Sequence, residues 1–166
     1  MTDETDVINA AAARVLDLCR TRRLTIATAE SCTGGLVAGA LTEIPGSSDV
    51  LDRGFVTYSN AAKQQVLGVS AATLRARGAV SAETAREMVT GLLKVAGTSL
   101  GVAITGIAGP GGGSADKPVG LVHFAAARAG GSLIERREVF ADEDRAGVRR
   151  RSVLTALAML AQIAET

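Results

Sequence analysis

Apolar residues recur along this chain in two patterns, one with the period of a helix and one typical of buried strands. Helical spacing predicts helices over residues 3–22, 33–44, 60–67, 82–96 and 143–164, with a shorter helix after Ser70. Runs rich in apolar and β-branched residues predict strands over residues 24–28, 52–59, 99–105, 119–128 and 133–140. Ser59, Ser70 and Ser81 stand where N-caps are expected, since a serine hydroxyl can accept a first-turn N–H.

The order of these elements predicts an α/β fold. Strands alternate with helices along most of the chain, and the last two strands flank Ala129-Gly130-Gly131, which favours an antiparallel hairpin. We therefore expect a mixed sheet with helices on both faces. With 166 residues and no evident linker or repeat, the chain is predicted to form one domain.

Composition excludes several classes of partner. The formal net charge of +1 provides no broad field for nucleic acid or an anionic membrane, and 2% aromatic residues leave few platforms for base stacking. No apolar run approaches the ~20 residues of a membrane span. The polar start at residues 1–6 does not resemble a secretory signal, so a cytoplasmic location is expected.

Metal and disulfide chemistry are not indicated either. Cys19 and Cys32 form no framework pattern and are expected to remain thiols in a reducing compartment. His123 is the single histidine, so a zinc site is not expected, and we expect no cofactor. The sequence is compatible with a magnesium ion bound by carboxylates but does not require one. His123 lies in a predicted strand and is interpreted as packed or exposed rather than catalytic.

The segment AESCTGG at residues 29–35 places a hydroxyl between a buried strand and a helix opened by glycines. Ser31 therefore lies at the carboxyl end of a strand, where the N–H groups of Thr33 and Gly34 could face an anion or a developing oxyanion. In the alternative, Ser31 or Thr33 is only an N-cap and the glycines ease helix packing.

A glycine-dense loop at residues 106–114 follows the third predicted strand. Its backbone N–H groups could cradle a phosphate, although it fits neither the dinucleotide fingerprint nor the nucleoside-triphosphatase loop, and a flexible connection is the alternative. Because ligands bind at the carboxyl ends of strands in open α/β sheets, this loop and Ser31 are expected at the same edge. The Ser114-x-x-Lys117 pattern is discounted because Pro118 and the glycines disfavour a helix.

A serine hydroxyl needs a base, and Lys63 could serve if its pKa were lowered, with Tyr58 between the two relaying the proton. The alternative is a solvated lysine and a core tyrosine. Arg145 and Arg149 share a helix face and could grip a phosphate, although such a run is more often solvated.

Taken together, several ordered blocks resemble the CinA carboxyl-terminal domain family, which includes the nicotinamide-nucleotide amidohydrolases. The blocks are residues 29–35, GFVTYSN at 54–60 with Lys63, GAVS at 78–81, TGIAGP at 105–110 and KPVG at 117–120. Their order and spacing match over nearly the whole chain. One departure is GSAD at residues 113–116, where Gly-Ser-Glu-Glu is typical, and this puts substrate affinity in question if the acidic pair contributes.

The resemblance implies a three-layer α/β/α sandwich, with a mixed, mainly parallel sheet and one antiparallel hairpin. It implies hydrolysis of the carboxamide of nicotinamide mononucleotide to nicotinate mononucleotide and ammonia, with a catalytic group that falls on Ser31, Tyr58 and Lys63. Larger relatives carry an additional amino-terminal domain, for which residues 1–166 leave no room, so that domain's activity is not transferred. We expect a homo-oligomer, a dimer or higher.

On this basis we expect a small-molecule nucleotide as the substrate. The expected binding residues are Thr33, Gly34, Asn60, Thr105, Gly106, Gly109, Arg145 and Arg149. Two alternatives stay open: a non-catalytic pyridine-nucleotide-binding or regulatory module, and an amidase in which Cys32 is the nucleophile.

Overall fold

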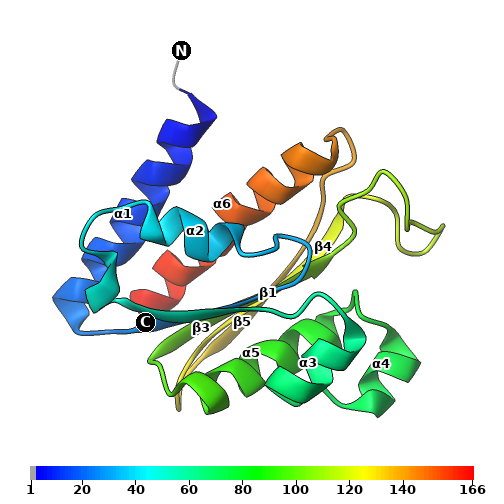
Figure 1. Ribbon diagram of the computed structural model, residues 1–166, viewed down its shortest axis with the longest axis horizontal. Helices are drawn as coiled ribbons and strands as arrows, with labels where there is room; N and C mark the ends of the chain where they lie inside the picture. The colour runs from blue at the N-terminus through cyan, green and yellow to red at the C-terminus, as the bar shows by residue number, and fades with distance from the viewer. Residues whose placement is uncertain (1–2) are drawn as a thin grey trace.

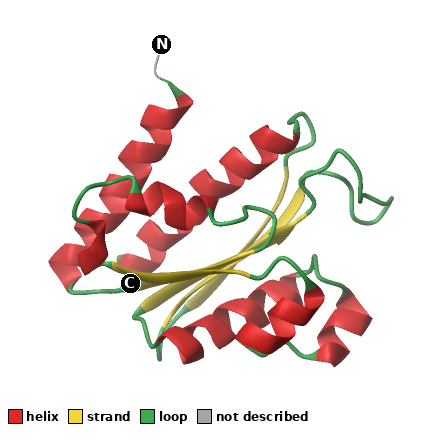
Figure 2. Ribbon diagram, in the orientation of Figure 1, coloured by secondary structure: helices red, strands yellow, loops and turns green. Residues whose placement is uncertain are grey.

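The computed structural model describes residues 3–166 as three layers, a central sheet covered by helices on each face (Figures 1 and 2). Met1 and Thr2, part of the polar start, lie outside the described residues. The helices are α1 (Glu4–Arg22), α2 (Leu36–Thr42), α3 (Asn60–Leu67), α4 (Ala71–Arg77), α5 (Ala82–Ala96) and α6 (Arg145–Ala164), with a short 3₁₀ helix at Ser47–Asp49. The strands are β1 (Ile26–Glu30), β2 (Leu51–Val56), β3 (Leu100–Gly106), β4 (Leu121–Arg128) and β5 (Leu133–Val139).

The sheet has the strand order β2-β1-β3-β4-β5. β1 pairs in parallel with both β2 and β3, whereas β4 is antiparallel to its neighbours β3 and β5. Four of the five strands therefore run in one direction, and β4–β5 is the hairpin expected around Gly130. The α/β/α sandwich with a mixed, mainly parallel sheet is confirmed.

Each face of the sheet has its own apolar core. Helices α1, α2 and α6 cover one face, where Leu16, Leu41 and Leu157 are fully buried with Phe124 (Figure 1). Helices α3, α4 and α5 cover the other, around Met88 and Leu92. Small β-strand residues such as Ala27 and Ala103 bring the α5 layer close to the sheet. The scarcity of aromatic residues is thus met by close packing of aliphatic side chains.

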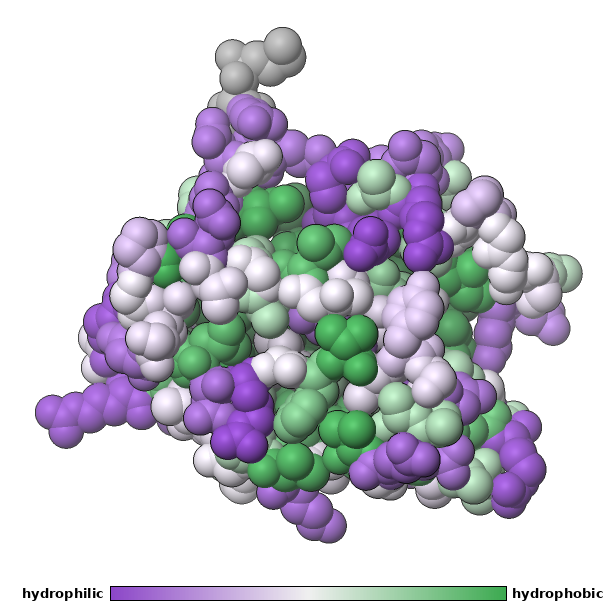
Figure 3. Space-filling model, in the orientation of Figure 1, coloured by the Kyte–Doolittle hydropathy of each residue, from purple (hydrophilic) through white to green (hydrophobic). Residues whose placement is uncertain are grey.

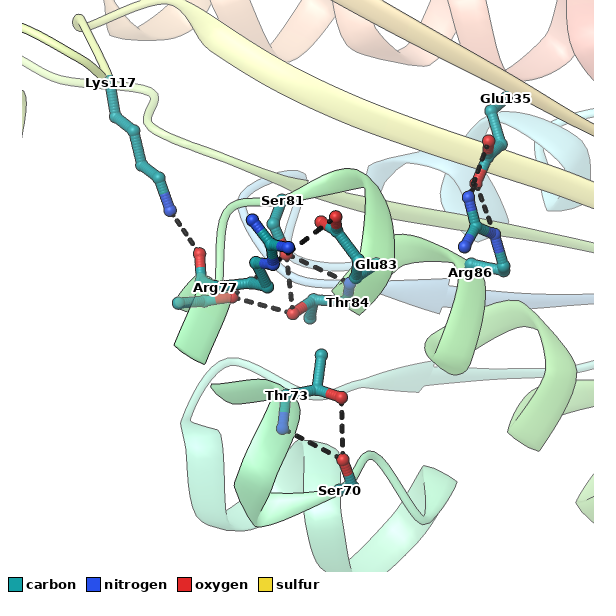
Figure 4. Close-up of polar contacts among 10 residues, drawn as sticks. Ser70, Thr73, Arg77, Ser81, Glu83, Thr84, Arg86, Lys117 and Glu135 are labelled. Carbon is teal, nitrogen blue, oxygen red and sulfur yellow. Dashed lines mark hydrogen bonds and ion pairs between the residues drawn. The ribbon is translucent and has the colours of Figure 1, made fainter. Parts of the chain in front are cut away.

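Serine caps begin three helices where the sequence predicts them. Ser59, Ser70 and Ser81 accept N–H groups from the first turns of α3, α4 and α5, at 3.0–3.1 Å. Figure 4 shows the Ser70–Thr73 and Ser81–Thr84 contacts, together with Lys117, whose ammonium donates to the carbonyl of Arg77 at the end of α4. Lys117 therefore ties the glycine-dense loop to the α4 layer.

Two predicted boundaries differ from the structure in a way that concerns Ser31. The first strand runs to Glu30 rather than ending at residue 28, because it pairs with β2 and β3 through that residue. The next helix begins at Leu36 rather than at residue 33, because Gly34 and Gly35 adopt left-handed conformations with φ of 58° and 101°. Ser31 consequently follows the strand directly and opens a tight turn.

Exposed apolar side chains gather at the β2 edge. Val56 is 52% exposed and Leu36 is 40% exposed. Apolar (green) side chains lie across the middle of the face shown in Figure 3, where β2 passes. Within residues 3–166, none of the helices has the combination of length and apolar character that a membrane crossing requires.

We expect Gly91→Ala to destabilise the fold by at least about 2 kcal/mol, because a Cβ there would lie 1.7 Å from the Leu67 carbonyl oxygen and would force α5 away from α3. Urea unfolding followed by circular dichroism measures this. The matched control is Gly39→Ala in α2, where a Cβ meets nothing within 4 Å, and a gain of about 0.5–1 kcal/mol is expected. Equal unfolding free energies for the two variants would contradict the packing argument.

Candidate active site

Ser31 stands at the point where β1 turns into the α2 layer. Its N–H donates to the Ile104 carbonyl of β3 at 3.0 Å, which joins the corner to the neighbouring strand. The Gly34 N–H donates to the Ser31 carbonyl at 3.0 Å and closes the turn. The hydroxyl is thereby held at the carboxyl end of two adjacent parallel strands.

The buried carboxylate of Glu30 fixes the other end of this turn. It accepts the N–H groups of Val37 and Ala38 at 2.9 and 3.1 Å, and the hydroxyl of Thr28 donates to it at 3.3 Å. A carboxylate at the first turn of a helix satisfies donors that lack intrahelical partners and suits the positive end of the helix dipole. Sequence reasoning gave Glu30 no role, although its place beside Ser31 is a signal of one.

Lys63 points from α3 into the interior and meets Ser31. Only 1% of this residue is exposed, and its Nζ donates to the Ser31 Oγ at 3.0 Å and to the Thr57 carbonyl at 2.8 Å. The Ser59 cap and the start of α3 at Asn60 aim this side chain toward the sheet. The interpretation of Lys63 as a solvated helix lysine is therefore wrong.

Burial lowers the pKa of Lys63 below its ordinary value of 10.5, because an ammonium loses its hydration there. The nearby Cys32 opposes this shift. Both hydrogen-bond acceptors of the amine are neutral oxygens, so neither compensates the charged form as a carboxylate would. Burial thus shifts the amine toward its neutral form, and it does so within hydrogen-bond distance of a hydroxyl, as a base that activates a serine would require.

Tyr58 is placed differently from the expectation. The residue is 61% exposed, and its hydroxyl accepts a hydrogen bond from Arg145 Nη2 at 3.1 Å. The expectation that Tyr58 lies between Ser31 and Lys63 is therefore wrong, because the Lys63 amine and the Ser31 hydroxyl contact each other directly. Arg145 also donates to the Gly109 carbonyl at 2.7 Å and so joins Tyr58 to the glycine-dense loop.

These groups line one cavity of about 270 Å³. Its wall combines the turn at Ser31 and Cys32, the start of α3, the segment before α5, the glycine-dense loop and the start of α6. The lining residues are Ser31, Cys32, Tyr58, Asn60, Lys63, Ala79, Val80, Thr105, Gly106, Ile107, Ala108, Gly109, Gly111, Gly112 and Arg145. The Ser31 turn and the glycine loop therefore meet at the same sheet edge, as predicted.

Sequence reasoning missed the wall formed by Ala79 and Val80. The hydroxyl of Thr105 donates to the Ala79 carbonyl at 2.7 Å and holds this segment against β3. The only signal was the GAVS block at residues 78–81, which carries part of the family resemblance but contains no reactive side chain.

Three residues expected to bind substrate do not line the cavity: Thr33, Gly34 and Arg149. The Gly34 N–H is already used by the Ser31 carbonyl, so its expected contact with an anion is wrong. Arg149 donates to the carbonyls of Cys32 and Thr33 at 3.1 and 3.4 Å and lines a separate cavity. Its guanidinium is thus engaged with the turn that follows Ser31.

The Cys32 thiol adjoins the cavity but is poorly suited to attack. The residue is 5% exposed, and burial raises the pKa of its thiol to about 12. A thiolate is the reactive form, and it is scarce at neutral pH under these conditions. The geometry favours Ser31 over Cys32.

His123 lies outside this site, on the wall of a different cavity with Lys117 and Arg137. Partial burial and these two cations lower the pKa of its imidazole. Among residues 3–166, no group of three or more His, Cys, Asp or Glu side chains is arranged to hold a metal ion.

Comparison with known proteins gives consistent matches. The CinA C-terminal domain model matches residues 8–164. The nicotinamide-nucleotide amidohydrolase PncC of Escherichia coli K12 is 53% identical over 143 residues, which is 86% of each protein. A CinA-like protein of Anaeromyxobacter dehalogenans is 53% identical over 135 residues, 81% of this chain and 33% of that protein. The chain spans about a third of the length of the first curated relatives it matches, 32–37%.

Solved structures agree. The competence/damage inducible protein CihA from Agrobacterium tumefaciens superposes with a TM-score of 0.93 at 50% identity, covering 95% of both chains. A CinA superfamily protein from Klebsiella pneumoniae gives a TM-score of 0.90 at 37% identity, over 95% of this chain and 98% of that one.

The buried amine predicts a distinct pH dependence of stability. Because the folded state lowers the pKa of Lys63, the unfolded chain binds more protons between that lowered pKa and 10.5. The free energy of unfolding should therefore rise with pH in this window by up to about 1.4 kcal/mol per pH unit from this group. In Lys63→Met this contribution is absent, so the variant should lose stability relative to the wild type as pH rises.

Urea unfolding at pH values from 7 to 10 checks this. Lys94→Met, at an exposed lysine near the end of α5, is the control and should follow the wild type at every pH. A constant difference between Lys63→Met and the wild type across this range would refute a lowered pKa for the buried amine.

Proposed function

The chain belongs to the CinA C-terminal domain family, and from this premise we propose that it hydrolyses the carboxamide of nicotinamide mononucleotide to nicotinate mononucleotide and ammonia. One observation carries the proposal: the Nζ of the buried Lys63 lies 3.0 Å from the Ser31 Oγ in a cavity at the carboxyl end of the sheet. The choice of substrate is supported by the 53% identity to the nicotinamide-nucleotide amidohydrolase PncC of Escherichia coli, with the match covering 86% of each protein.

In the first step, Ser31 attacks the carboxamide carbon. The neutral amine of Lys63 accepts the hydroxyl proton across the contact it already makes, and the C–O bond forms as the carbonyl electron pair moves to oxygen. We assign stabilisation of the oxyanion to backbone N–H groups of the turn that follows Ser31.

In the second step, the oxyanion collapses and the C–N bond breaks. The Lys63 ammonium gives its proton to the departing nitrogen, which leaves as ammonia, and Ser31 keeps the acyl group as an ester. Water then attacks this ester, Lys63 accepts the proton of the water, and the serine oxygen recovers a proton as the nicotinate product leaves. A single amine thus serves both as base and as acid.

The substrate's phosphate is assigned to the opposite wall of the cavity. Arg145 supplies the cation, and the loop from Gly106 to Gly112 supplies backbone that a ligand can approach closely. Tyr58 holds the Arg145 guanidinium through the 3.1 Å contact, while Asn60 and Thr105 form polar walls. Binding of this remote group would position the amide beside Ser31.

We further propose that residues 1–166 act as one amidohydrolase domain and need no cofactor. The substrate is a small-molecule nucleotide rather than nucleic acid or a membrane. The protein works in the cytoplasm as a homo-oligomer. The GSAD segment at 113–116 lies just beyond the loop residues that line the cavity, so its departure from the family pattern bears on affinity rather than on the chemical step.

We expect purified protein to release ammonia from nicotinamide mononucleotide, and Ser31→Ala and Lys63→Met each to lower kcat by at least about 10³-fold, since nucleophile and base act as a unit. An enzyme-coupled ammonia assay measures this. Ser47→Ala, at a buried serine in the 3₁₀ helix away from the cavity, is the matched control and should retain the wild-type rate.

Binding of the nucleotide without ammonia release would favour the alternative of a regulatory module. An unchanged rate in Ser31→Ala, combined with loss of activity on thiol alkylation, would favour Cys32 as the nucleophile.

The rate should also depend on pH through Lys63. Only the neutral amine accepts the serine proton, so kcat/KM should rise with pH and level off above an inflection that lies below 10.5, the ordinary pKa of lysine. A pH profile with nicotinamide mononucleotide at limiting concentration measures this. A rate that falls with rising pH across this range would show that Lys63 is not the base.

A further inference from the structure

Tyr58 is the one tyrosine of the chain, and it lines the same cavity as Ser31 and Lys63. Those two residues are buried, whereas Tyr58 is 61% exposed. The proposed reaction uses only its hydroxyl, as the partner of Arg145. The aromatic ring, which is the larger part of the side chain, is thus open to a ligand in the cavity and has no role in the steps described above.

The two ends of Tyr58 contact opposite parts of the site. At the backbone end, the carbonyl of the peptide that joins Thr57 to Tyr58 accepts a hydrogen bond from the Lys63 Nζ at 2.8 Å. At the far end, the hydroxyl accepts a hydrogen bond from Arg145 Nη2 at 3.1 Å. The ring therefore lies between the amine beside Ser31 and the guanidinium assigned to the phosphate. The pyridine ring and the ribose of the substrate have to bridge the same interval.

The cavity wall offers no counter-ion to the ring of the proposed substrate. The nicotinamide ring of the mononucleotide is a pyridinium cation, because its nitrogen is bonded to the ribose. Among residues 3–166, those that line the cavity include the cationic side chain of Arg145 but no carboxylate. A cation removed from water needs a compensating partner, and the electron-rich face of an aromatic ring is one. Tyr58 supplies the only aromatic ring of this wall.

No side chain of the protein already occupies the Tyr58 ring in this way. The cation–π contact found within residues 3–166 is that of Arg151, whose guanidinium lies 5.4 Å from the centre of the Phe140 ring, and neither residue lines the cavity. Arg145 instead approaches Tyr58 at the hydroxyl, through a hydrogen bond. This contact orders the ring and leaves the cation–π interaction to a ligand.

Resting on the proposed function, we propose that Tyr58 is a specificity-determining residue whose ring binds the cationic pyridinium and discriminates against an uncharged nicotinamide ring. Because Arg145 orders the side chain before the substrate enters, little rotamer freedom is lost on binding. The site thereby selects two charges of opposite sign on one molecule, the ring cation at Tyr58 and the phosphate at Arg145. Free nicotinamide carries neither charge.

The test compares two ligands that share the phosphate and differ in ring charge, nicotinamide mononucleotide and its 1,4-dihydro form, whose ring is neutral. Calorimetric titration of Ser31→Ala avoids turnover. In this background we expect the cationic form to bind about 5–30-fold more tightly, as a cation–π contact predicts. Adding Tyr58→Leu should abolish the preference, and adding Tyr58→Phe, which keeps the ring, should retain it. Any effect on the phosphate site through Arg145 acts on both ligands and cancels in the ratio.

The same preference in the Leu and Phe variants, or no preference in Ser31→Ala alone, would overturn the inference. Both substitutions are at an exposed position, so both variants are expected to fold, which circular dichroism checks.

Tyr58 also reports directly on its own contact, because the chain has one tyrosine and no tryptophan. Tyrosine emission of Ser31→Ala therefore comes from this ring alone. We expect nicotinamide mononucleotide to quench it saturably, beyond the light absorption measured with N-acetyltyrosinamide in the same solution. Ribose 5-phosphate, which has the phosphate but no pyridinium, should not quench it. Unchanged emission at a nucleotide concentration that saturates the calorimetric signal would overturn the inference.

Steady-state kinetics separate this role from proton relay. In the enzyme with Ser31 intact, Tyr58→Leu should raise KM for nicotinamide mononucleotide by about 5–30-fold with a smaller change in kcat. A large loss of kcat shared by Tyr58→Leu and Tyr58→Phe, with KM unchanged, would identify a proton relay and overturn the inference. If the wild type releases no ammonia but the preference for the cationic ring is present and is lost in Tyr58→Leu, only the proposed reaction fails.

Discussion

The buried contact between the amine of Lys63 and the hydroxyl of Ser31 is the constraint on which the rest of the site depends. An ammonium removed from water without a counter-ion is costly, and a lysine is retained in such a place only where the surrounding fold holds it. Here α3 is fixed by the Ser59 cap and packs through Leu67 against the α5 core, while the Thr57 carbonyl supplies the second acceptor. The packing of one sheet face thus holds the buried contact at its edge.

The strand order brings the other parts to this contact. β1 and β3 are adjacent and parallel, so the segments that follow them leave the sheet at the same edge. The first becomes a tight turn that carries Ser31, and the second becomes a glycine-dense loop with little side-chain volume. The position of the Ser31 hydroxyl and the backbone-lined wall opposite it are therefore consequences of one strand order, as is common where ligands bind open α/β sheets.

Local patterns were sufficient to predict the elements but not the directions of long side chains. Periodicity and capping placed the helices and strands, because apolar faces and serine caps act over a few residues. The expected positions of Tyr58 and Arg149 were wrong because each is set by a contact between α6 and a distant part of the chain. Tyr58 contacts Arg145, 87 residues later, and Arg149 contacts Cys32, 117 residues earlier. The burial of Lys63 beside Ser31 could not be predicted from its spacing, which suits a solvated lysine, and only the family resemblance singled this residue out.

The start of α6 links the wall of the cavity to the turn that follows Ser31. Residues four apart on a helix lie one above the other, so Arg145 and Arg149 project from the same face at different depths. The outer one reaches Gly109 and Tyr58, and the inner one reaches Cys32 and Thr33. A small shift of this helix would therefore displace the wall and the turn together. Because Val148 and Ser152, on the same helix, are fully buried, the helix is held by the core rather than by the site, and the relative position of both arginines is set before any substrate enters.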